Sequence, residues 1–285
     1  IIGQEIGMYD DDPDWQVYFN LLGALYQEHP LRIDIAGTVE TIAKINADLL
    51  YRCYDCFYNL HNMVLAVAGN CTADQVLEIA DELLKPCEDQ KLETVFPEES
   101  LDIVRPETVE SAAVGQTLFN LGIKIATKTG YANLKAEMEA TIAMQILAGT
   151  SSPLYQKMLQ EGYINSVFST EVFNGDGFFT MIFGGESREP RMVRKEITEA
   201  LLNAQKNGLD EALFAECKKS TYGALVRELN NVSAVTNALV SAHMAGCGIF
   251  DTLHVLSDMT LEDCNRFLRE EVDVQHMTLS MIEPA

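Results

Sequence analysis

The sequence predicts an α+β fold with a mainly antiparallel sheet and helices packed on one face. Three observations lead to this prediction. Long stretches carry apolar residues at helical spacing behind recognisable N-caps, short apolar runs have the length of buried strands, and a glycine-containing turn at 174–177 joins two strands as a hairpin. With 285 residues, the chain is long enough for about two domains, each with its own core.

The first third of the chain is predicted to be mostly helical. Residues 1–10 are compatible with a helix, and Asp12 can cap the next one because Pro13 suits the first helical position, where an N–H has no partner. After a loop at 28–37, Asn46 caps an amphipathic helix. The apolar run at 63–68 then has the length of a buried strand, and a capping box of Thr72 with Gln75 opens a helix to about residue 84.

Residues 86–112 are rich in Glu, Asp, Pro and Thr without a sustained period, and they are predicted to be a linker. The domains are therefore expected at 1–85, the C-terminal part of a first unit, and at 113–285, a second unit. The acidic pairs 98–99 and 270–271 are expected on solvated faces. The second unit should contain a strand at 114–126, a helix at 133–147, the hairpin at 166–183, helices over 190–245, and a last helix and strand that begin at Thr260.

An internal repeat supports this division. A cap, a helix, a loop and an apolar strand recur without a gap 214 positions apart, so the chain is expected to hold one whole unit preceded by the last third of another, in a longer parent chain. The corresponding pairs are Asn46 and Thr260, Arg52 and Arg266, Met63 and Met277, and Leu65 and Leu279.

Composition excludes several classes of function. Forty-three acidic and 20 basic residues give a net charge of −23, which disfavours nucleic acids and anionic membrane surfaces. Seven cysteines without a disulfide-type pattern favour a reducing compartment, so a cytoplasmic location is expected. The sequence shows no membrane-spanning apolar stretch and no targeting leader.

The segment GQEIGMYDDDPD at residues 3–14 carries Glu5. It is followed by the helix with Trp15, by His-Pro at 29–30, by Ala-Gly-Thr at 36–38 and by NMVLAVAG at 62–69. Together these motifs resemble the pitrilysin and insulinase family of inverted-motif zinc peptidases, and most of all its bacterial two-repeat members of the processing-peptidase type. The likeness covers essentially the whole chain.

The resemblance implies a duplicated metallohydrolase-type fold and a zinc cofactor. In that family two histidines of an H-x-x-E-H helix and a glutamate further along the chain hold zinc, which leaves an open position for water. By position, Glu5 is the third metal ligand, and the histidine pair and the catalytic glutamate would lie upstream of residue 1. No catalytic residue is then expected within the fragment, which alone should be inactive.

The second unit is expected to be non-catalytic. The position 214 residues after Glu5 is Lys219, whose ammonium cannot ligate zinc, and no H-x-x-E-H occurs in the chain. The resemblance implies that this unit encloses the peptide substrate and that a segment like 151–164 contacts it. Here the expected arginine falls on Leu159 or Gln156, so substrate contact by Tyr163 and plain packing of Tyr163 both stay open.

Other sites have weaker support. The C-x-x-C at 53–56 is at most half a zinc site, and on a helix its cysteines are more simply core-facing. The aspartates at 10–14 lack the glycine and glutamate of a calcium loop. The preferred function is the C-terminal portion of a zinc-dependent peptidase that encloses and hydrolyses peptides or small unfolded proteins. The alternatives are a non-catalytic scaffold or partner subunit of the same superfamily, in a homo- or heterodimer, and an unrelated acidic interaction module.

Overall fold

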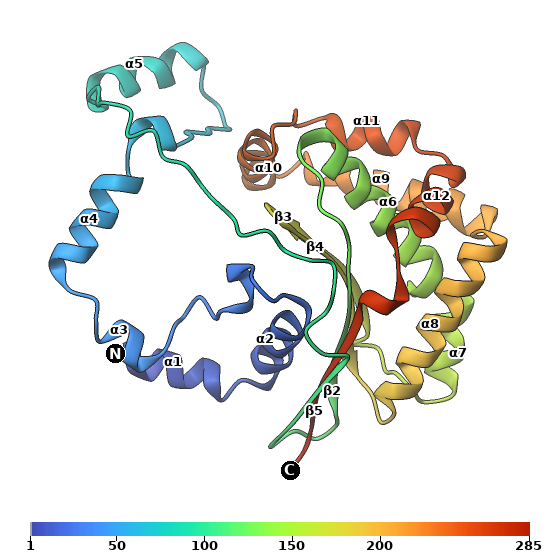
Figure 1. Ribbon diagram of the computed structural model, residues 1–285. Coiled ribbons are helices and arrows are strands. Elements are labelled where there is room, and N and C mark those ends of the chain that lie inside the picture. The colour runs from blue at the N-terminus through green and yellow to red at the C-terminus, as the bar shows by residue number, and fades with distance from the viewer. Residues whose placement is uncertain (1) are drawn as a thin grey trace.

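The computed structural model describes residues 2–285, so Ile1, the first residue of the predicted helix 1–10, lies outside the described residues. The chain forms the predicted α+β fold, with one sheet and many helices (Figure 1). The helices are α1 (Ile2–Asp10), α2 (Pro13–Leu25), η1 (Pro30–Arg32), α3 (Val39–Ile42), α4 (Ala47–Phe57), η2 (Leu60–Asn62), α5 (Ala73–Leu83), α6 (Gly130–Ala148), α7 (Pro153–Gln160), α8 (Pro190–Asn207), α9 (Glu211–Glu228), α10 (Val232–Met244), α11 (Asp251–Asp258), α12 (Leu261–Glu271) and η3 (Val274–His276).

The sheet has five strands in the order β1-β5-β2-β4-β3. All neighbouring strands are antiparallel except β1 and β5, which run parallel. The prediction of a mainly antiparallel sheet is therefore confirmed. The strands are β1 (Glu107–Ala112), β2 (Leu118–Lys124), β3 (Ser169–Gly175), β4 (Phe178–Glu186) and β5 (Met277–Pro284).

The main hydrophobic core lies on the face of the sheet that is covered by α6, α8, α11 and α12. Leu121, Phe183 and Leu279 are in register on adjacent strands, and all three are fully buried. Because side chains alternate along a strand, these residues share one face with their neighbours two positions away. Buried residues of α6, α8, α11 and α12 complete this core, and Figure 1 shows these helices on one side of the sheet.

The opposite face of the sheet is covered in part by α2. Leu21, Leu22 and Leu25 of this helix form a second buried cluster with Ile182 of β4. The helix can approach closely because Gly122 has no side chain: a Cβ there would lie 2.9 Å from a methyl of Leu25 and 3.0 Å from one of Leu21. Although α2 precedes the predicted linker, it is packed on the sheet of the second unit.

Residues 39–84 contain α3, α4 and α5 and stand apart from the sheet in Figure 1. None of these three helices has a buried residue. The predicted strand at 63–68 is wrong for this structure, since these residues form no strand and Leu65 is 66% exposed. A strand needs a neighbour to pair its backbone groups, and among the described residues the backbone of 63–68 makes no such hydrogen bond.

The repeat is visible in the helices. The bounds of α4 and α12, and those of η2 and η3, differ by the same 214 positions as the sequence pattern. The predicted caps are also present, since the side chains of Asn46, Thr72 and Thr260 accept hydrogen bonds from the first turns of their helices.

The segment predicted as a linker, 86–112, has no regular structure until β1 begins at Glu107. β1 pairs with β5 over its whole length, so the end of this segment is part of the sheet. The boundaries 1–85, 86–112 and 113–285 stay a prediction.

Candidate functional site

Glu5, the predicted metal ligand, lies on α1 with an exposed side chain. Among the described residues its carboxylate makes no hydrogen bond or ion pair. It borders a hollow of about 260 Å³ whose walls are mainly apolar and include Ile6, Tyr9, Trp15 and Ile35. An unpaired carboxylate beside an apolar hollow is free to take a ligand.

The donor set around Glu5 fits one ligand of a shared zinc site and not a complete site. A protein zinc site needs three or four nitrogen, sulfur or oxygen ligands. Within residues 2–285, no group of three or more His, Cys, Asp or Glu side chains is close enough to hold a metal ion. Two further ligands must therefore come from outside the described residues if Glu5 binds zinc.

Trp15 of α2 connects α1 with the loop after η1. The rings of Tyr9 on α1 and Trp15 lie 4.8 Å apart, and the Trp15 indole N–H donates to Asp34 Oδ2 at 2.6 Å. Between the two helices, the Asp12 side chain accepts hydrogen bonds from the Asp14 and Trp15 amides, which caps α2 as predicted. These contacts give the helix that carries Glu5 a defined place beside α2.

Tyr163, the predicted substrate contact, is half-buried just after α7 and packs against the main core. Its amide donates to the Met158 carbonyl at 2.9 Å. Gln156, one of the two positions on which the expected arginine falls, has a structural role, since its side chain donates a hydrogen bond to the Thr150 carbonyl. The structure therefore shows packing for Tyr163 and does not test substrate contact.

Glu99 forms a buried acidic anchor that no local sequence pattern predicts. Glu99 was expected on a solvated face, but only 6% of its side chain is exposed. One carboxylate oxygen accepts the Gln27 amide at 3.0 Å and the Lys124 ammonium at 2.5 Å. The other accepts the amides of Glu28 and His29, each at 2.7 Å. The expectation for Glu99 is wrong because its partners lie far away in the sequence, where no local pattern indicates them.

The Glu99 anchor is defined by Glu99, Lys124 and the amides of residues 27–29. Burial by itself raises the pKa of Glu99. The hydrogen bonds from the Lys124 ammonium and the three amides lower it by more than burial raises it, and the resulting pKa is about 2. Burial lowers the pKa of Lys124, and Glu99 opposes this effect. The Lys124 ammonium also donates to the Leu25 carbonyl at 3.0 Å. The anchor thus ties the predicted linker and the end of α2 to β2.

A hollow of about 520 Å³ lies beside β3. Its walls come from the end of α6, the following loop, α7, α9 and the start of β3, and include Thr150, Ser151, Ser169 and Glu216. β3 is at the end of the strand order and pairs only with β4 among the described strands, so one side of its backbone is unpaired. An extended peptide could add to such an edge.

The second unit has no catalytic cluster at the position that corresponds to Glu5. Lys219 is exposed on α9. In the C-x-x-C motif, Cys53 is exposed and Cys56 is half-buried, so the expectation that both face a core is wrong in this structure, where α4 has no core to contact. All seven cysteines are free thiols.

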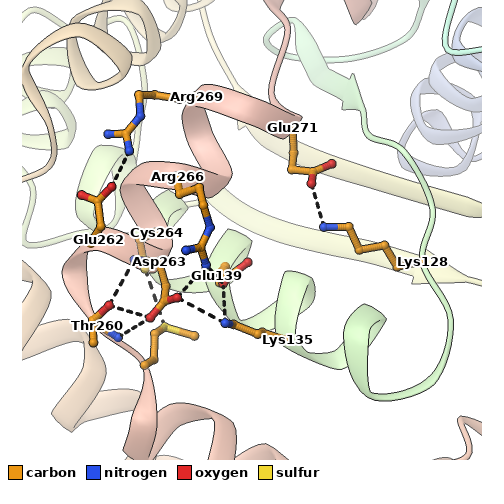
Figure 2. A network of polar contacts seen from close by, with 11 residues as sticks. Lys128, Lys135, Glu139, Thr260, Glu262, Asp263, Cys264, Arg266, Arg269 and Glu271 are labelled. Carbon is orange, nitrogen blue, oxygen red and sulfur yellow. Dashed lines mark hydrogen bonds and ion pairs between the residues drawn. The ribbon is translucent and has the colours of Figure 1, made fainter.

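A further polar network lies between α6 and α12 (Figure 2). Asp263 accepts hydrogen bonds from the Thr260 backbone, from Lys135 at 3.2 Å and from Arg266 at 2.7 Å. Beneath it, one carboxylate oxygen of Glu139 is buried without a hydrogen bond, 3.6 Å from the Lys135 ammonium. This network fixes α12 on α6 and holds no substrate-like or metal-like arrangement.

Comparison with known proteins identifies the family. A model of the peptidase M16 inactive domain matches residues 44–221. The chain belongs to this family. The chain is thus an M16 inactive domain portion, and it contains no H-x-x-E-H motif.

Bacterial proteins named zinc proteases match along the whole chain. The uncharacterized zinc protease YmfH of Bacillus subtilis is 34% identical over 293 residues, which cover 100% of this chain and 67% of the relative. YmxG of the same organism, also named a zinc protease, is 24% identical and is covered to 69%. The chain therefore spans about two thirds of these relatives, and its resemblance to the zinc peptidase family is confirmed.

Solved structures agree with this assignment. An M16-like protein from Alicyclobacillus acidocaldarius has a TM-score of 0.94 at 31% identity, with 100% of this chain and 69% of that chain covered. A peptidase M16 inactive domain from Pseudomonas fluorescens has a TM-score of 0.80 at 14% identity, over 100% of this chain and 68% of that one, which shows the shared fold. Between residues 2 and 285, no helix has both the length and the apolar character needed to cross a membrane.

Proposed function

We propose that this chain is the C-terminal portion of a zinc-dependent peptidase that encloses and hydrolyses peptides or small unfolded proteins. The observation that carries the proposal is the 34% identity, along the entire chain, to a protein named a zinc protease. The free carboxylate of Glu5 beside its hollow supports it, since a zinc site requires such a ligand.

In the proposed parent protein, Glu5 holds zinc together with two histidines supplied upstream. When bound by three protein ligands, zinc lowers the pKa of its water toward ~7 and so supplies a hydroxide nucleophile. The second unit forms the far wall of the substrate chamber. The chain alone is expected to be inactive, because it provides one carboxylate and neither the histidine pair nor the general base.

The edge of β3 and the hollow beside it are the proposed place for an extended peptide. Their support is the unpaired strand edge and the hydroxyl groups of Thr150, Ser151 and Ser169 in the hollow wall. Tyr163 stays a proposed substrate contact, because its half-buried side chain makes no hydrogen bond through its hydroxyl among the described residues. Replacing Tyr163 with Phe should raise KM and leave kcat unchanged if the hydroxyl binds substrate.

The decisive experiment measures zinc content and peptide cleavage in the full-length parent protein. Glu5→Gln should remove most of the bound zinc and the activity that EDTA also abolishes. Glu28→Gln is the matched control, because Glu28 is also exposed and the substitution removes the same charge. Full zinc and full activity in Glu5→Gln would sink the proposal.

The same protein decides between the peptidase and a non-catalytic scaffold or partner subunit. A parent chain without an H-x-x-E-H motif and without zinc would support the scaffold. We further propose a bacterial, cytoplasmic protein that forms a homo- or heterodimer with a related subunit. The seven free thiols support a reducing compartment, and light scattering of the purified parent would measure its oligomeric state.

A further inference from the structure

Trp15 and Asp34 form a clamp next to Glu5. The Trp15 indole N–H donates to Asp34 Oδ2 at 2.6 Å, and Asp34 Oδ1 accepts the Ala36 amide at 2.8 Å. The Asp34 carboxylate thus joins the Trp15 side chain of α2 to the loop that follows η1. A hydrogen bond to a charged acceptor is stronger than one between neutral groups, so this contact restricts the indole ring as well as the loop.

The clamp forms the wall on which α1 rests. Trp15, Ile35 and Ala36 line the hollow that Glu5 borders, and Tyr9 of α1 packs on the Trp15 ring with a centroid distance of 4.8 Å. The Tyr9 carbonyl also accepts the amide of Asp12, the N-cap of α2. The direction of α1, and with it the place of the Glu5 carboxylate, therefore depends on Trp15.

The clamp is connected to the second unit through α2. Leu21 and Leu25, on the same helix as Trp15, pack over Gly122 of β2, and the Tyr26 hydroxyl makes a 2.6 Å hydrogen bond with Thr180 of β4. The Lys124 ammonium of the Glu99 anchor bonds the Leu25 carbonyl. A rigid helix held at this end by a buried sheet gives its other end a defined position.

We infer that Trp15 and Asp34 are positioning residues that hold the Glu5 carboxylate in place for the metal, with the sheet of the non-catalytic unit as their support. This inference rests on the proposed function. Groups that hydrogen-bond a metal ligand typically change metal affinity 10- to 100-fold when they are replaced, and groups that act through the helix of the ligand, as here, are expected at the lower end of that range. Neither side chain is itself a ligand in this inference, since the Trp15 nitrogen is a donor and Asp34 accepts two hydrogen bonds.

The test compares Asp34→Asn and Trp15→Phe with Asp273→Asn. Asp273, the N-cap of η3, is a matched control because it accepts the amide two residues later at 2.8 Å, as Asp34 does, but does not border the hollow beside Glu5. Trp15→Phe keeps an aromatic ring for Tyr9 and removes the N–H, so it is the milder variant if Asp34→Asn folds poorly. Zinc affinity is measured in the full-length parent by competition with a chelator.

Both clamp variants should weaken zinc binding about tenfold or more, while Asp273→Asn leaves it unchanged. In a Glu5→Gln background, Asp34→Asn should have no further effect on zinc affinity, because its action passes through Glu5. A purely structural role would lower thermal stability and leave zinc affinity unchanged, and that result would overturn the inference.

The clamp itself can be observed without metal. Trp15 is the only tryptophan of the 285 residues, so the tryptophan emission of this chain reports the clamp alone. Asp34→Asn should shift the emission to the red and increase quenching by acrylamide, and Asp273→Asn should do neither. If Glu5→Gln keeps its zinc, the proposed function fails. If Glu5→Gln loses zinc and the clamp variants keep it, only the present inference fails.

Discussion

Two segments of this molecule, 46–68 and 260–282, share a pattern but differ in their surroundings. Both have a capped helix and a short 3₁₀ turn at matching positions. In the second segment an eight-residue strand, β5, follows and lies between β1 and β2. In the first segment the apolar residues that follow form no strand.

Burial separates the two copies more clearly than secondary structure does. Leu65 is 66% exposed, whereas its counterpart Leu279 is fully buried, and Tyr54 is 57% exposed against 0% for Leu268. A helix closes its hydrogen bonds within itself, and a strand cannot. The caps and the turn are therefore local properties of the sequence, while the strand depends on neighbours that only the second copy has.

The second copy also has an electrostatic attachment that the first lacks. Arg266 bonds Asp263 and lies 3.9 Å from Glu139 of α6. Its counterpart Arg52 is exposed and makes no ion pair with any described residue. Ion pairs thus attach α12 to α6, whereas Arg52 of the corresponding helix α4 makes no such attachment among the described residues.

The largest expected difference between the copies is in core substitutions. Leu279→Ala should lower the free energy of unfolding by roughly 2–5 kcal/mol, because it leaves a cavity in the main core. Leu65→Ala should change it by less than about 0.5 kcal/mol in this chain, since the side chain is exposed. Urea denaturation of both variants measures the two values.

The comparison becomes sharper in the full-length parent. If an upstream segment supplies neighbours for residues 63–68, Leu65→Ala should there cost as much as Leu279→Ala, and the amides of 63–68 should be protected from hydrogen exchange. Equal, small effects of Leu65→Ala in both proteins would show that the first copy stays uncovered.

The next effect concerns the Glu99 anchor, which joins the segment between the two copies to the sheet. The pKa of Glu99 is about 2 in the folded protein, below its ordinary value of 4.5. A lowered pKa stabilises the fold fully above the unfolded value, and the contribution is lost as pH falls from about 4.5 through about 2. Linkage makes this contribution on the order of 3 kcal/mol.

Urea denaturation between pH 7 and pH 2.5 measures this loss. Glu99→Gln should be strongly destabilising at pH 7, because it leaves Lys124 buried without a counter-charge. Its difference from the unaltered chain should narrow toward pH 2. Glu98→Gln, at an exposed neighbouring position, is the control. A pH-independent difference would contradict the assigned pKa.

A smaller effect of opposite sign is expected at Glu139. Burial raises the pKa of this carboxyl, and Lys135 and Arg266 offset the increase in part. A raised acid pKa favours the folded state below the unfolded pKa, and this advantage is lost as pH rises through the folded value. Glu139→Gln should therefore stabilise the protein at pH 7 by up to about 1 kcal/mol, with no gain in acid. Loss of stability at pH 7 would show that the ion network outweighs burial.

The smallest expected effects are those of the caps. Thr260→Ala should lower the free energy of global unfolding by about 1 kcal/mol, because α12 is part of the core layer. Asn46→Ala should destabilise the helical form of α4 by a similar free energy, so that its first turn frays. It should leave the free energy of global unfolding unchanged, since no residue of that helix is buried. Far-UV circular dichroism and urea denaturation together separate the two outcomes.

Much of the fold could be predicted from the sequence because its signals are local. Asp12 with Pro13, and Thr260 with Asp263, show their caps within four residues of chain. The hairpin at 174–177 and the repeat offset are equally visible. The family resemblance points to Glu5, whose side chain is exposed in the structure, and its role as a metal ligand stays a prediction.

The remaining features depend on contacts between distant residues. Glu99 and Lys124 are 25 positions apart, and Trp15 and Asp34 are 19 apart, with no periodic pattern to connect them. The apolar run at 63–68 was expected to be buried because its composition is that of a core strand, yet composition cannot supply a neighbour. These errors concern packing partners and not local conformation.

The position of β5 has a consequence for synthesis of the chain. Residues 277–284 are the last of the sheet to be made, but they lie between β1 and β2, second in the strand order. On the ribosome, β1 must therefore wait for the strand that pairs with it, while β2, β3 and β4 can already associate. A chain that ends before Met277 would lack β5, and β1 could then not join β2, β3 and β4 in one sheet. The complete sheet can therefore form only after residues 277–284 have been translated.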